Sequence, residues 1–262
     1  ADDIDLVTGD IRDVETCRRV CEGKALVLHH AALGSVPHSM ADPATAFAVN
    51  VGGTANVFAA AHGAGVKRVV YASSSAVYGD GEGLPKKEGE EGKPLSPYAL
   101  SKVMNEQLGD VFARCYGMDL VGLRYFNVFG PRQDPAGPYA AVIPRFFAAC
   151  RAGEPPTIFG DGQQGRDFVY VADVVRANLL AATVPLQGAH AVNIGAGVVT
   201  TVLELAETII QTTSAKVKPK LTDPRPGDVL MSQADTTAAR ALLGFSAERA
   251  VTDGLASMGD RS

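Results

Sequence analysis

Residues 67–75, KRVVYASSS, join an apolar run to three serines at its carboxyl end. The run does not alternate between apolar and polar side chains, which indicates a strand buried on both faces of a parallel sheet. Similar runs occur at 25–33 and 119–130, and helical patterns at 43–65 and 97–117 separate them. Strands that alternate with helices predict βαβ units, so we expect an α/β fold with a doubly wound parallel sheet.

The pattern changes near Gly130, where loops rich in glycine and proline begin to interrupt shorter helices. We therefore expect a main domain at 1–130 and a smaller lobe at 131–262, with a strand at 190–196 that returns to the main sheet. A further strand, IDLVTGD, is expected at 4–10. The shorter helices are predicted at 141–152, 173–184, 201–213 and 235–243.

Composition excludes several classes of function. The chain has 262 residues, a net charge of −5 and no block of Lys or Arg, which argues against nucleic-acid binding. We find no signal-peptide pattern and no apolar run long enough to span a bilayer. His29 and His30 are assigned to the sheet core. The four cysteines lack zinc-ligand spacing and are expected to be free thiols, which predicts a reducing cytoplasm: Cys17, Cys21, Cys115 and Cys150.

The segment SPYALSK, residues 96–102, suggests acid–base chemistry. Ser96 suits a helix N-cap, and Tyr98 then lies in the first turn with Lys102 one turn later on the same face. Both the helix N-terminus and the Lys102 charge favour a phenolate, so we expect the Tyr98 pKa to fall from about 10 toward neutrality. The alternative is an ordinary surface pair. The serines of 73–75 are placed at the same ligand-binding edge of the sheet, with a self-satisfied serine turn as their alternative.

With these residues the chain resembles the extended short-chain dehydrogenase/reductases, and among them the nucleotide-sugar 4-epimerases. Matching segments follow in order along nearly the whole chain, and they are most similar to those of bacterial UDP-N-acetylglucosamine 4-epimerases of polysaccharide biosynthesis. Dehydratase relatives carry Thr-Asp-Glu where this chain has Ser74, Ser75 and Ala76, so a dehydratase is disfavoured. The segments that carry the resemblance are SSSAVYGD (73–80), SPYALSK (96–102), LRYFNVFGPRQ (123–133), GDGQQGRDFVYV (160–171) and RPGD (225–228).

The resemblance implies a Rossmann domain that holds NAD, a smaller UDP-sugar-binding lobe and a homodimer. It implies that Tyr98 is the base, that Lys102 lowers its pKa and that Ser74 or Ser75 holds the sugar's 4-oxygen. The implied cofactor-binding residues are Asp10, Ile11, Ala31, Ala32, Leu33, Asn50, Ser73, Tyr98, Lys102, Tyr125 and Val128. The implied substrate-binding residues are Gly34, Ser35, Ser74, Ser75, Tyr98, Asn127, Ala141, Val142, Arg145, Arg166, Arg225, Asp228 and Ser232.

Several of these residues also have a plain structural explanation. Asn50 can serve as a structural amide, and Arg166 and Arg225 can simply be solvated loop cations. A nucleotide diphosphate nevertheless needs planar cations with several donors, which arginine supplies. Ser232 corresponds to the family's gate beside the sugar's C2 substituent, where a small side chain leaves room for an N-acetyl group.

One departure from the family is large. The sequence has no Gly-x-x-Gly-x-x-Gly turn, whose backbone N–H groups hold the NAD pyrophosphate in the family. Gly52 and Gly53 lie in a helical pattern, where close packing is the expected role. The sequence thus resembles a fragment that begins at the family's third strand, for which we expect weak NAD binding or none, and little epimerase activity. The alternatives to an epimerase are a nucleotide-sugar oxidoreductase or decarboxylase, and a non-catalytic fragment.

Overall fold

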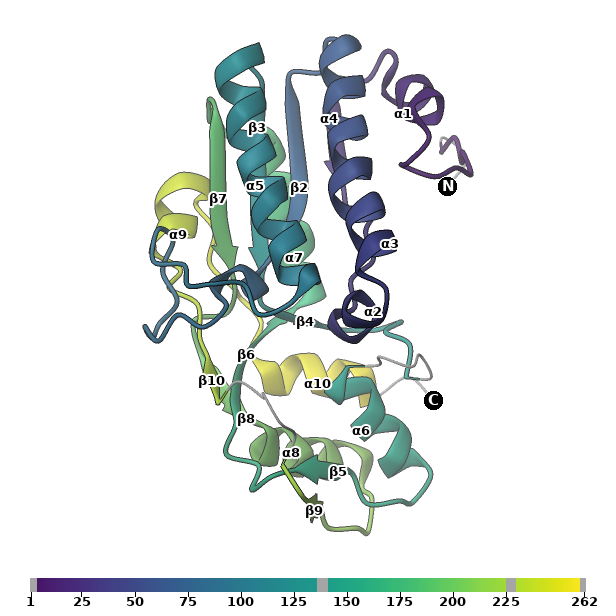
Figure 1. Ribbon diagram of the computed structural model, residues 1–262. Helices are drawn as coiled ribbons and strands as arrows, with labels where there is room; N and C mark the ends of the chain where they lie inside the picture. The colour runs from purple at the N-terminus through teal and green to yellow at the C-terminus, as the bar shows by residue number, and fades with distance from the viewer. Residues whose placement is uncertain (1–3, 136–140, 225–229, 260–262) are drawn as a thin grey trace. The chain divides into compact units, whose positions relative to one another are not determined.

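The computed structural model describes residues 4–135, 141–224 and 230–259, which fall into two compact units (Figure 1). The first unit comprises Ala1–Glu82, Glu90–Arg124 and Asn178–Val192. The second comprises Gly83–Gly89, Tyr125–Ala177 and Asn193–Ser262. Each unit has its own hydrophobic core. The roles expected for a cofactor domain at 1–130 and a substrate lobe at 131–262 stay predictions.

The first unit is built on a four-stranded parallel sheet. β1 runs parallel to β2, with Leu26 opposite Arg68 and His29 opposite Tyr71. Side chains of both middle strands are fully buried, among them Val69 and Leu120, as expected for runs without alternation. The doubly wound α/β fold is confirmed. The strands lie in the order β1 (Leu26–His29), β2 (Arg68–Ser74), β3 (Asp119–Tyr125) and β7 (Ala189–Ile194).

Helices cover this sheet, and Figure 1 shows α4 and α5 side by side across one of its faces. The core between them contains Phe58, whose ring meets Tyr71 and Phe112 edge-on at centroid distances of 5.3 and 5.6 Å. The helical segments of the first unit are α1 (Val14–Cys21), α2 (Val36–Ala41), α3 (Pro43–Phe47), the π-helical η1 (Ala48–Gly53), α4 (Thr54–Gly63), the 3₁₀ turn η2 (Ser75–Tyr78) and α5 (Pro97–Tyr116).

α5 begins and ends where the sequence indicates. The Ser96 hydroxyl accepts the N–H of Ala99 at 3.1 Å, and Pro97 occupies the first helical position. The helix ends at Gly117, whose φ of 65° is a left-handed conformation that glycine adopts without strain. The catalytic pair predicted in SPYALSK therefore starts a regular helix.

The helical stretch Pro43–Gly63 is long and apolar enough to cross a membrane by length and composition, with a mean hydropathy of 1.2. This differs from the expectation that no apolar run is long enough to span a bilayer. In the structure Ala46, Phe58 and Ala61 are fully buried in the first unit. The stretch therefore serves as a core helix of that unit.

The strand predicted at 4–10 is wrong. These residues have no regular structure, and Ile4 and Leu6 are 78% and 91% exposed. β1 also covers only part of the run predicted at 25–33, and it lies at the edge of the sheet. A strand forms only where a neighbour supplies hydrogen-bonding partners, and the described residues place no such neighbour beside 4–10.

The second unit contains two small sheets. In the first, β6 (Gly165–Tyr170) pairs in parallel with β10 (Met231–Ser232) and β4 (Asn127–Phe129), and antiparallel with β8 (Val199–Thr201). In the second, β5 (Thr157–Phe159) pairs with β9 (Lys220–Thr222). The helices that begin or lie in this unit are α6 (Val142–Arg151), α7 (Val171–Thr183), α8 (Val202–Thr213), α9 (Thr237–Leu243) and α10 (Val251–Gly259).

The packing role predicted for the helical glycines holds for one of the two. A Cβ on Gly53 would lie 2.5 Å from the Ile11 side chain, whereas one on Gly52 would meet nothing within 4 Å. Gly53 therefore lets Ile11 pack directly on the helix, and Gly52 faces open space.

These neighbours make a matched pair for mutation. We expect Gly53→Ala to destabilise the chain by about 1–3 kcal/mol, because Ile11 must be displaced. We expect Gly52→Ala to be neutral or to stabilise it by up to about 1 kcal/mol, because alanine has the higher helix propensity. Urea unfolding followed by circular dichroism measures both, and equal effects would contradict the packing assigned to Gly53.

Candidate active site

Tyr98 and Lys102 lie together on α5 at the sheet edge. Lys102 is only 4% exposed, and its Nζ donates to the carbonyl of Ala72 in β2 at 2.8 Å. The same Nζ lies 5.8 Å from the centre of the Tyr98 ring. The pair is therefore a buried contact between α5 and β2, which rules out the surface-pair alternative.

Ser74, at the carboxyl end of β2, hydrogen-bonds to Tyr98. Its hydroxyl also accepts the N–H of Ala76 at 3.2 Å and so caps η2. Ser74 therefore has both roles expected of the serine segment. Its hydroxyl satisfies the backbone of its own turn, and it also contacts Tyr98. Ser75 is the half-buried first residue of η2. The geometry favours Ser74 over Ser75 as the residue that acts with Tyr98.

The expected lowering of the Tyr98 pKa is not found. Burial raises the pKa of the Tyr98 phenol, and the hydrogen bond from Ser74 acts in the opposite direction. The Lys102 ammonium lies over the Tyr98 ring and donates a hydrogen bond to the carbonyl of Ala72. Burial also lowers the pKa of Lys102 to about 8, and Glu106 opposes that shift. Desolvation disfavours the charged form of each group, and it therefore sets the direction of both pKa shifts.

Asn50 fixes the backbone at the end of β1. Its side chain accepts the N–H of Leu33 at 2.8 Å and donates to the Leu33 carbonyl at 3.1 Å. It also donates to the Ser101 hydroxyl on α5 at 3.1 Å. Asn50 is fully buried, so it is a structural amide that tethers the strand tip. Ala31 is exposed and Ala32 half-buried just before this tether.

Other residues predicted to bind the cofactor already have partners within the chain. Both carboxylate oxygens of Asp10 accept from the Arg12 side chain, which lowers the pKa of Asp10 to about 2. Ile11 packs on Gly53, and its carbonyl accepts from the Asn56 amide at 3.0 Å. The Ser73 hydroxyl donates to Glu106 at 2.5 Å, so this buried serine offers no free hydroxyl to a ligand.

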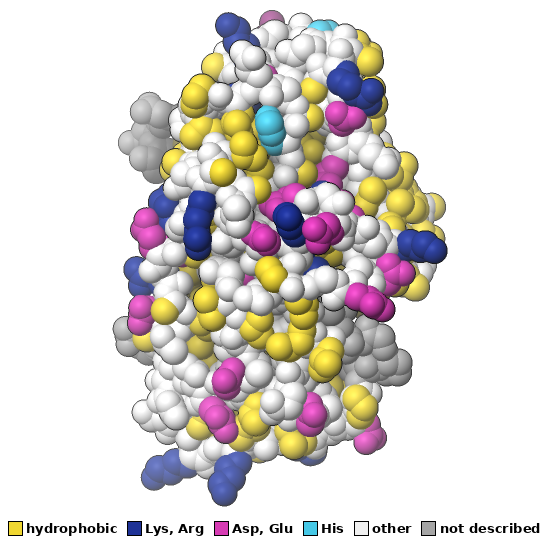
Figure 2. All heavy atoms as spheres, turned by 90° about the vertical axis from the view of Figure 1, so that its left-hand side faces the viewer, with side chains coloured by type: hydrophobic (Ala, Val, Ile, Leu, Met, Phe, Trp, Pro, Cys, Tyr) yellow, Lys and Arg dark blue, Asp and Glu magenta, His cyan; other side chains and the backbone are white. Residues whose placement is uncertain are grey.

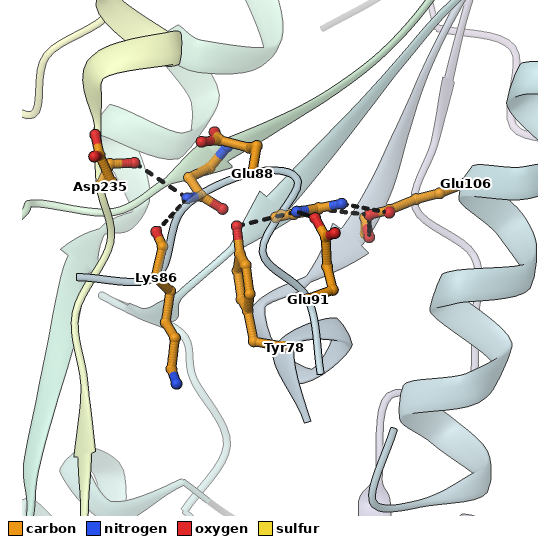
Figure 3. A network of polar contacts seen from close by, with 9 residues as sticks. Tyr78, Lys86, Glu88, Glu91, Glu106 and Asp235 are labelled. Atoms are coloured by element: carbon orange, nitrogen blue, oxygen red, sulfur yellow. Dashed lines mark hydrogen bonds and ion pairs between the residues drawn. The ribbon is translucent and has the colours of Figure 1, made fainter. Parts of the chain in front are cut away.

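A buried charged cluster of the first unit escaped the sequence analysis. Arg124 in β3 is 5% exposed and pairs with Glu106 of α5 and with Glu91, while it also donates to the Tyr78 hydroxyl at 3.0 Å. Figure 3 shows Tyr78, Glu91 and Glu106 converging from three segments. Arg124 lies inside the quoted segment LRYFNVFGPRQ, but nothing in the sequence indicates that its partners come from elsewhere.

In the second unit, three predicted substrate-binding residues lie on neighbouring strands. β6 places Arg166 opposite Ser232 of β10, and Phe168 opposite Asn127 of β4. Arg166 donates to the carbonyl of Gly165 at 2.9 Å, and Asn127 donates to that of Asp167 at 3.2 Å. Pairing within one sheet therefore gathers residues that are about a hundred positions apart in the chain.

A cavity of about 190 Å³ lies beside these strands. Asn127, Arg166 and Val142, all predicted to bind substrate, line it together. Its other polar and aromatic lining residues were not predicted, and they include Thr157, Phe159 and Gln164. A half-buried aromatic ring beside an arginine and amide groups suits a planar base that carries a phosphate.

The remaining predicted residues are dispersed. Gly34 is exposed, and the Ser35 hydroxyl caps α2 by accepting the N–H of His38 at 3.1 Å. Tyr125 ends β3, and Val128 lies in β4. Ala141 and Arg145 are exposed at the start of α6. Arg225 and Asp228 lie outside the described residues.

Two further features support the edge strand β10 that carries Ser232. Asp167, fully buried, accepts the N–H groups of Ala196, Gly197 and Ala234. Residues 83–89 also belong to this unit, and the N–H of Lys86 donates to the Gln233 carbonyl at 2.7 Å. Figure 3 shows Lys86 and Asp235 of this unit close together. Lys86 lies between Ser74 and Tyr98 in the sequence, so part of their connection is anchored next to Ser232.

No group of three or more potential metal ligands occurs among the residues that the structure describes. His29 is buried in the core, and its Nε2 lies 3.0 Å from the Thr54 hydroxyl. His30 is exposed, so its assignment to the sheet core is wrong. All four cysteines are free thiols. On the face drawn in Figure 2, Lys and Arg side chains are scattered among Asp and Glu.

The sequence matches the family model described as the NAD dependent epimerase/dehydratase family over residues 1–195. The chain belongs to this family. A UDP-glucose 4-epimerase of Mycolicibacterium smegmatis is 39% identical over 98% of this chain and 82% of its own length. A putative UDP-glucose 4-epimerase of Methanocaldococcus jannaschii is 38% identical over 91% of this chain and 77% of its own.

Solved structures agree with this assignment. A UDP-N-acetylglucosamine 4-epimerase from Methanobrevibacter ruminantium, in complex with UDP-N-acetylmuramic acid, is 38% identical with a TM-score of 0.92. The alignment covers 97% of this chain and 81% of that one. A UDP-glucose 4-epimerase from Thermotoga maritima, with UDP-glucose, is 37% identical with a TM-score of 0.91 and coverages of 96% and 82%. By kinship the chain is an NAD-dependent nucleotide-sugar epimerase.

The described residues of this epimerase fit one end of NAD. Lys102 is buried with its amine directed at the end of β2, and small side chains at Ala31 and Ala32 leave the end of β1 open to close approach. With Tyr98, these residues would hold the nicotinamide ribose. At the other end, Asp10 would have to exchange its Arg12 contacts for the cofactor. The weak binding expected without a glycine-rich turn stays a prediction.

The buried Lys102 should cost stability. Its pKa is about 8 in the folded chain against 10.5 in the unfolded one, so the unfolded chain binds more protons between these values and stability rises with pH there. Below pH 8 the full cost, about 3 kcal/mol, is present. We therefore expect Lys102→Met to raise the free energy of unfolding at pH 7. The increase should be smaller at pH 10, where the cost of burying Lys102 is smaller. Urea unfolding at both pH values checks this, and equal effects would contradict it.

Proposed function

We propose that this chain interconverts UDP-N-acetylglucosamine and UDP-N-acetylgalactosamine, and also UDP-glucose and UDP-galactose, by NAD-dependent epimerisation at C4. The observation that carries the proposal is the contact of Ser74 with Tyr98 beside the buried Lys102, in a chain of the epimerase family. The experiment that tests it is the conversion of UDP-N-acetylglucosamine by the purified protein supplied with excess NAD, followed by chromatography of the products.

In this proposal the proton moves through the chain's own side chains. Tyr98 takes the proton of the sugar's 4-hydroxyl and returns it to the epimer, and Ser74 holds the 4-oxygen through its hydroxyl. Bound NAD supplies the reversible hydride exchange at C4. Burial keeps Tyr98 a phenol in the free protein, so it first releases its own proton to solvent, and the Lys102 ammonium lowers the free energy of the resulting phenolate.

The nucleotide is assigned to the 190 Å³ cavity of the second unit. The uracil ring would lie against Phe159, with amide contacts from Gln164. Arg166 would donate to the diphosphate, since a guanidinium offers several donors in one plane. Arg145, Ala141, Arg225 and Asp228 are proposed to add substrate contacts, as the family resemblance implies.

Ser232 is proposed to set the choice between N-acetylated and plain sugars. It lies opposite Arg166 on the neighbouring strand, so its side chain is on the same face of the sheet. A serine at this position leaves volume for an acetamido group at C2. The comparisons establish the epimerase family, and the choice of sugar is proposed from Ser232.

A homodimer and a cytoplasmic location complete the proposal. Leu100 and Val111, about 40% exposed, are eleven residues apart on α5, which places both on one helix face. Such a face suits a second copy of the chain. The four free thiols suit a reducing compartment.

Tyr98→Phe should abolish epimerisation, with a loss of roughly 10²- to 10⁴-fold in kcat, because the acid–base hydroxyl is gone. Binding of UDP-sugar, measured by calorimetry, should change little. Tyr116→Phe, at the exposed end of the same helix, is the control and should retain activity. Full activity of Tyr98→Phe would overturn the assignment, and steady accumulation of NADH by the native chain would identify a net oxidoreductase instead.

Ser232→Tyr should lower kcat/KM for UDP-N-acetylglucosamine more than for UDP-glucose, because the larger side chain competes with the acetamido group for volume. A difference of roughly tenfold or more corresponds to steric exclusion of this size. Ser232→Ala, which stays small, is the matched control and should keep the native preference. Equal losses on both sugars in the tyrosine variant would show that Ser232 does not select the substrate.

A further inference from the structure

The Arg124 cluster joins four segments of the first unit immediately behind the catalytic residues. The Arg124 guanidinium donates to both oxygens of Glu106, from Nε to Oε1 at 2.9 Å and from Nη2 to Oε2 at 2.8 Å. It also donates to the Tyr78 hydroxyl at 3.0 Å and to Glu91. Because Arg124 and Glu106 meet in a bidentate pair away from water, their relative geometry is strongly fixed.

Glu106 links this cluster to the reactive groups. On α5 it follows Lys102 by one turn and Tyr98 by two, so the three side chains share one face of the helix. Its Oε1 also accepts the hydroxyl of Ser73 at 2.5 Å. Ser73 directly precedes Ser74, the partner of Tyr98. The Glu106 contact therefore fixes α5 against β2 one residue away from the Ser74–Tyr98 hydrogen bond.

We propose that Glu106 is a positioning residue for the epimerase reaction: held by Arg124 and Ser73, it sets Ser74 against Tyr98 and places a carboxylate one helical turn from Lys102. This rests on the function proposed above, because Lys102 and Tyr98 are its reacting groups. Glu106 itself touches neither sugar nor cofactor.

The other groups around Lys102 do not provide that charge. At the end of β1, His29 and the following His30 are imidazoles whose pKa values desolvation lowers, to about 4 for His29, so both are neutral above pH 7. β2 offers the carbonyl of Ala72 and, next to Glu106, the Tyr71 phenol, which burial keeps protonated. Among the described residues, Glu106 is the carboxylate that acts on Lys102. Its removal should therefore leave the ammonium without a counter-charge.

The decisive measurement is the titration of Lys102 in the free protein. Lysine labelled with ¹³C at the ε position reports each ammonium by NMR, and the Lys102 signal is the one absent from Lys102→Arg. We expect Lys102 in Glu106→Gln to lose its proton at a lower pH than in the native chain. Asp110→Asn is the matched control, because it removes a carboxylate one turn later on the same helix, where Asp110 pairs with Arg114 in solvent.

The same variants should separate positioning from binding in the assay. We expect Glu106→Gln to lower kcat by up to roughly 100-fold, as expected when a reacting group is displaced, while KM for UDP-N-acetylglucosamine stays close to native. The alkaline limb of the kcat profile should move to lower pH together with the Lys102 titration. Asp110→Asn should leave kcat, KM and the profile unchanged. Ser73→Ala, which keeps the Glu106 charge, should lower kcat and leave the Lys102 titration in place.

Removing Glu106 alone leaves a buried arginine without its main partner, which can prevent folding. The paired variant Glu106→Gln with Arg124→Gln removes both charges and serves in that case, with a smaller expected fall in the Lys102 titration, because the repelling Arg124 charge is removed as well. A Lys102 titration unchanged from native in the folded variant would overturn the inference. The NMR result needs no substrate or NAD, so a chain without epimerase activity would refute the proposed function and still leave this inference tested.

Discussion

The hydrogen bond between Ser74 and Tyr98 joins the end of β2 to the first turn of α5, and the arrangement of the site depends on it. Two elements that follow each other in the chain meet there because the parallel sheet places its carboxyl ends at one edge. Ser96 then starts α5 at the position that brings Tyr98 to that edge. A change in where β2 ends or α5 begins would separate the two hydroxyls.

Burial of Lys102 is the main energetic cost of this arrangement. The Lys102 ammonium leaves water, and it donates a hydrogen bond to the carbonyl of Ala72. Desolvation therefore shifts both Lys102 and Tyr98 toward their neutral forms, and Glu106 is the group that opposes the shift at Lys102. Groups that must hold a charge away from water commonly have shifted pKa values, and such shifts suit them to proton transfer near neutral pH.

The second unit brings together the residues that are proposed to bind the nucleotide. Its strands are short, and the order β10–β6–β4 brings Ser232, Arg166 and Asn127 onto neighbouring strands. Asp167 holds the edge strand in place through the N–H of Ala234. A buried carboxylate that accepts three backbone N–H groups is a strong anchor for irregular chain, and here it supports the strand on which the proposed specificity residue lies.

The sequence by itself determined the fold class, the start of α5 at Ser96 and the pairing of Tyr98 with Lys102, because these follow from local periodicity and spacing. It also led to the family through its motifs, which the comparisons confirm. Tertiary structure decided the rest. Residues 4–10 have a strand's pattern but no strand, because pairing depends on a neighbour. The Tyr98 pKa is raised rather than lowered, because burial is a property of the packed chain. Arg124 and Glu106 could not be recognised as partners, since eighteen residues of sequence separate them and only the packing of α5 on the sheet brings them into contact.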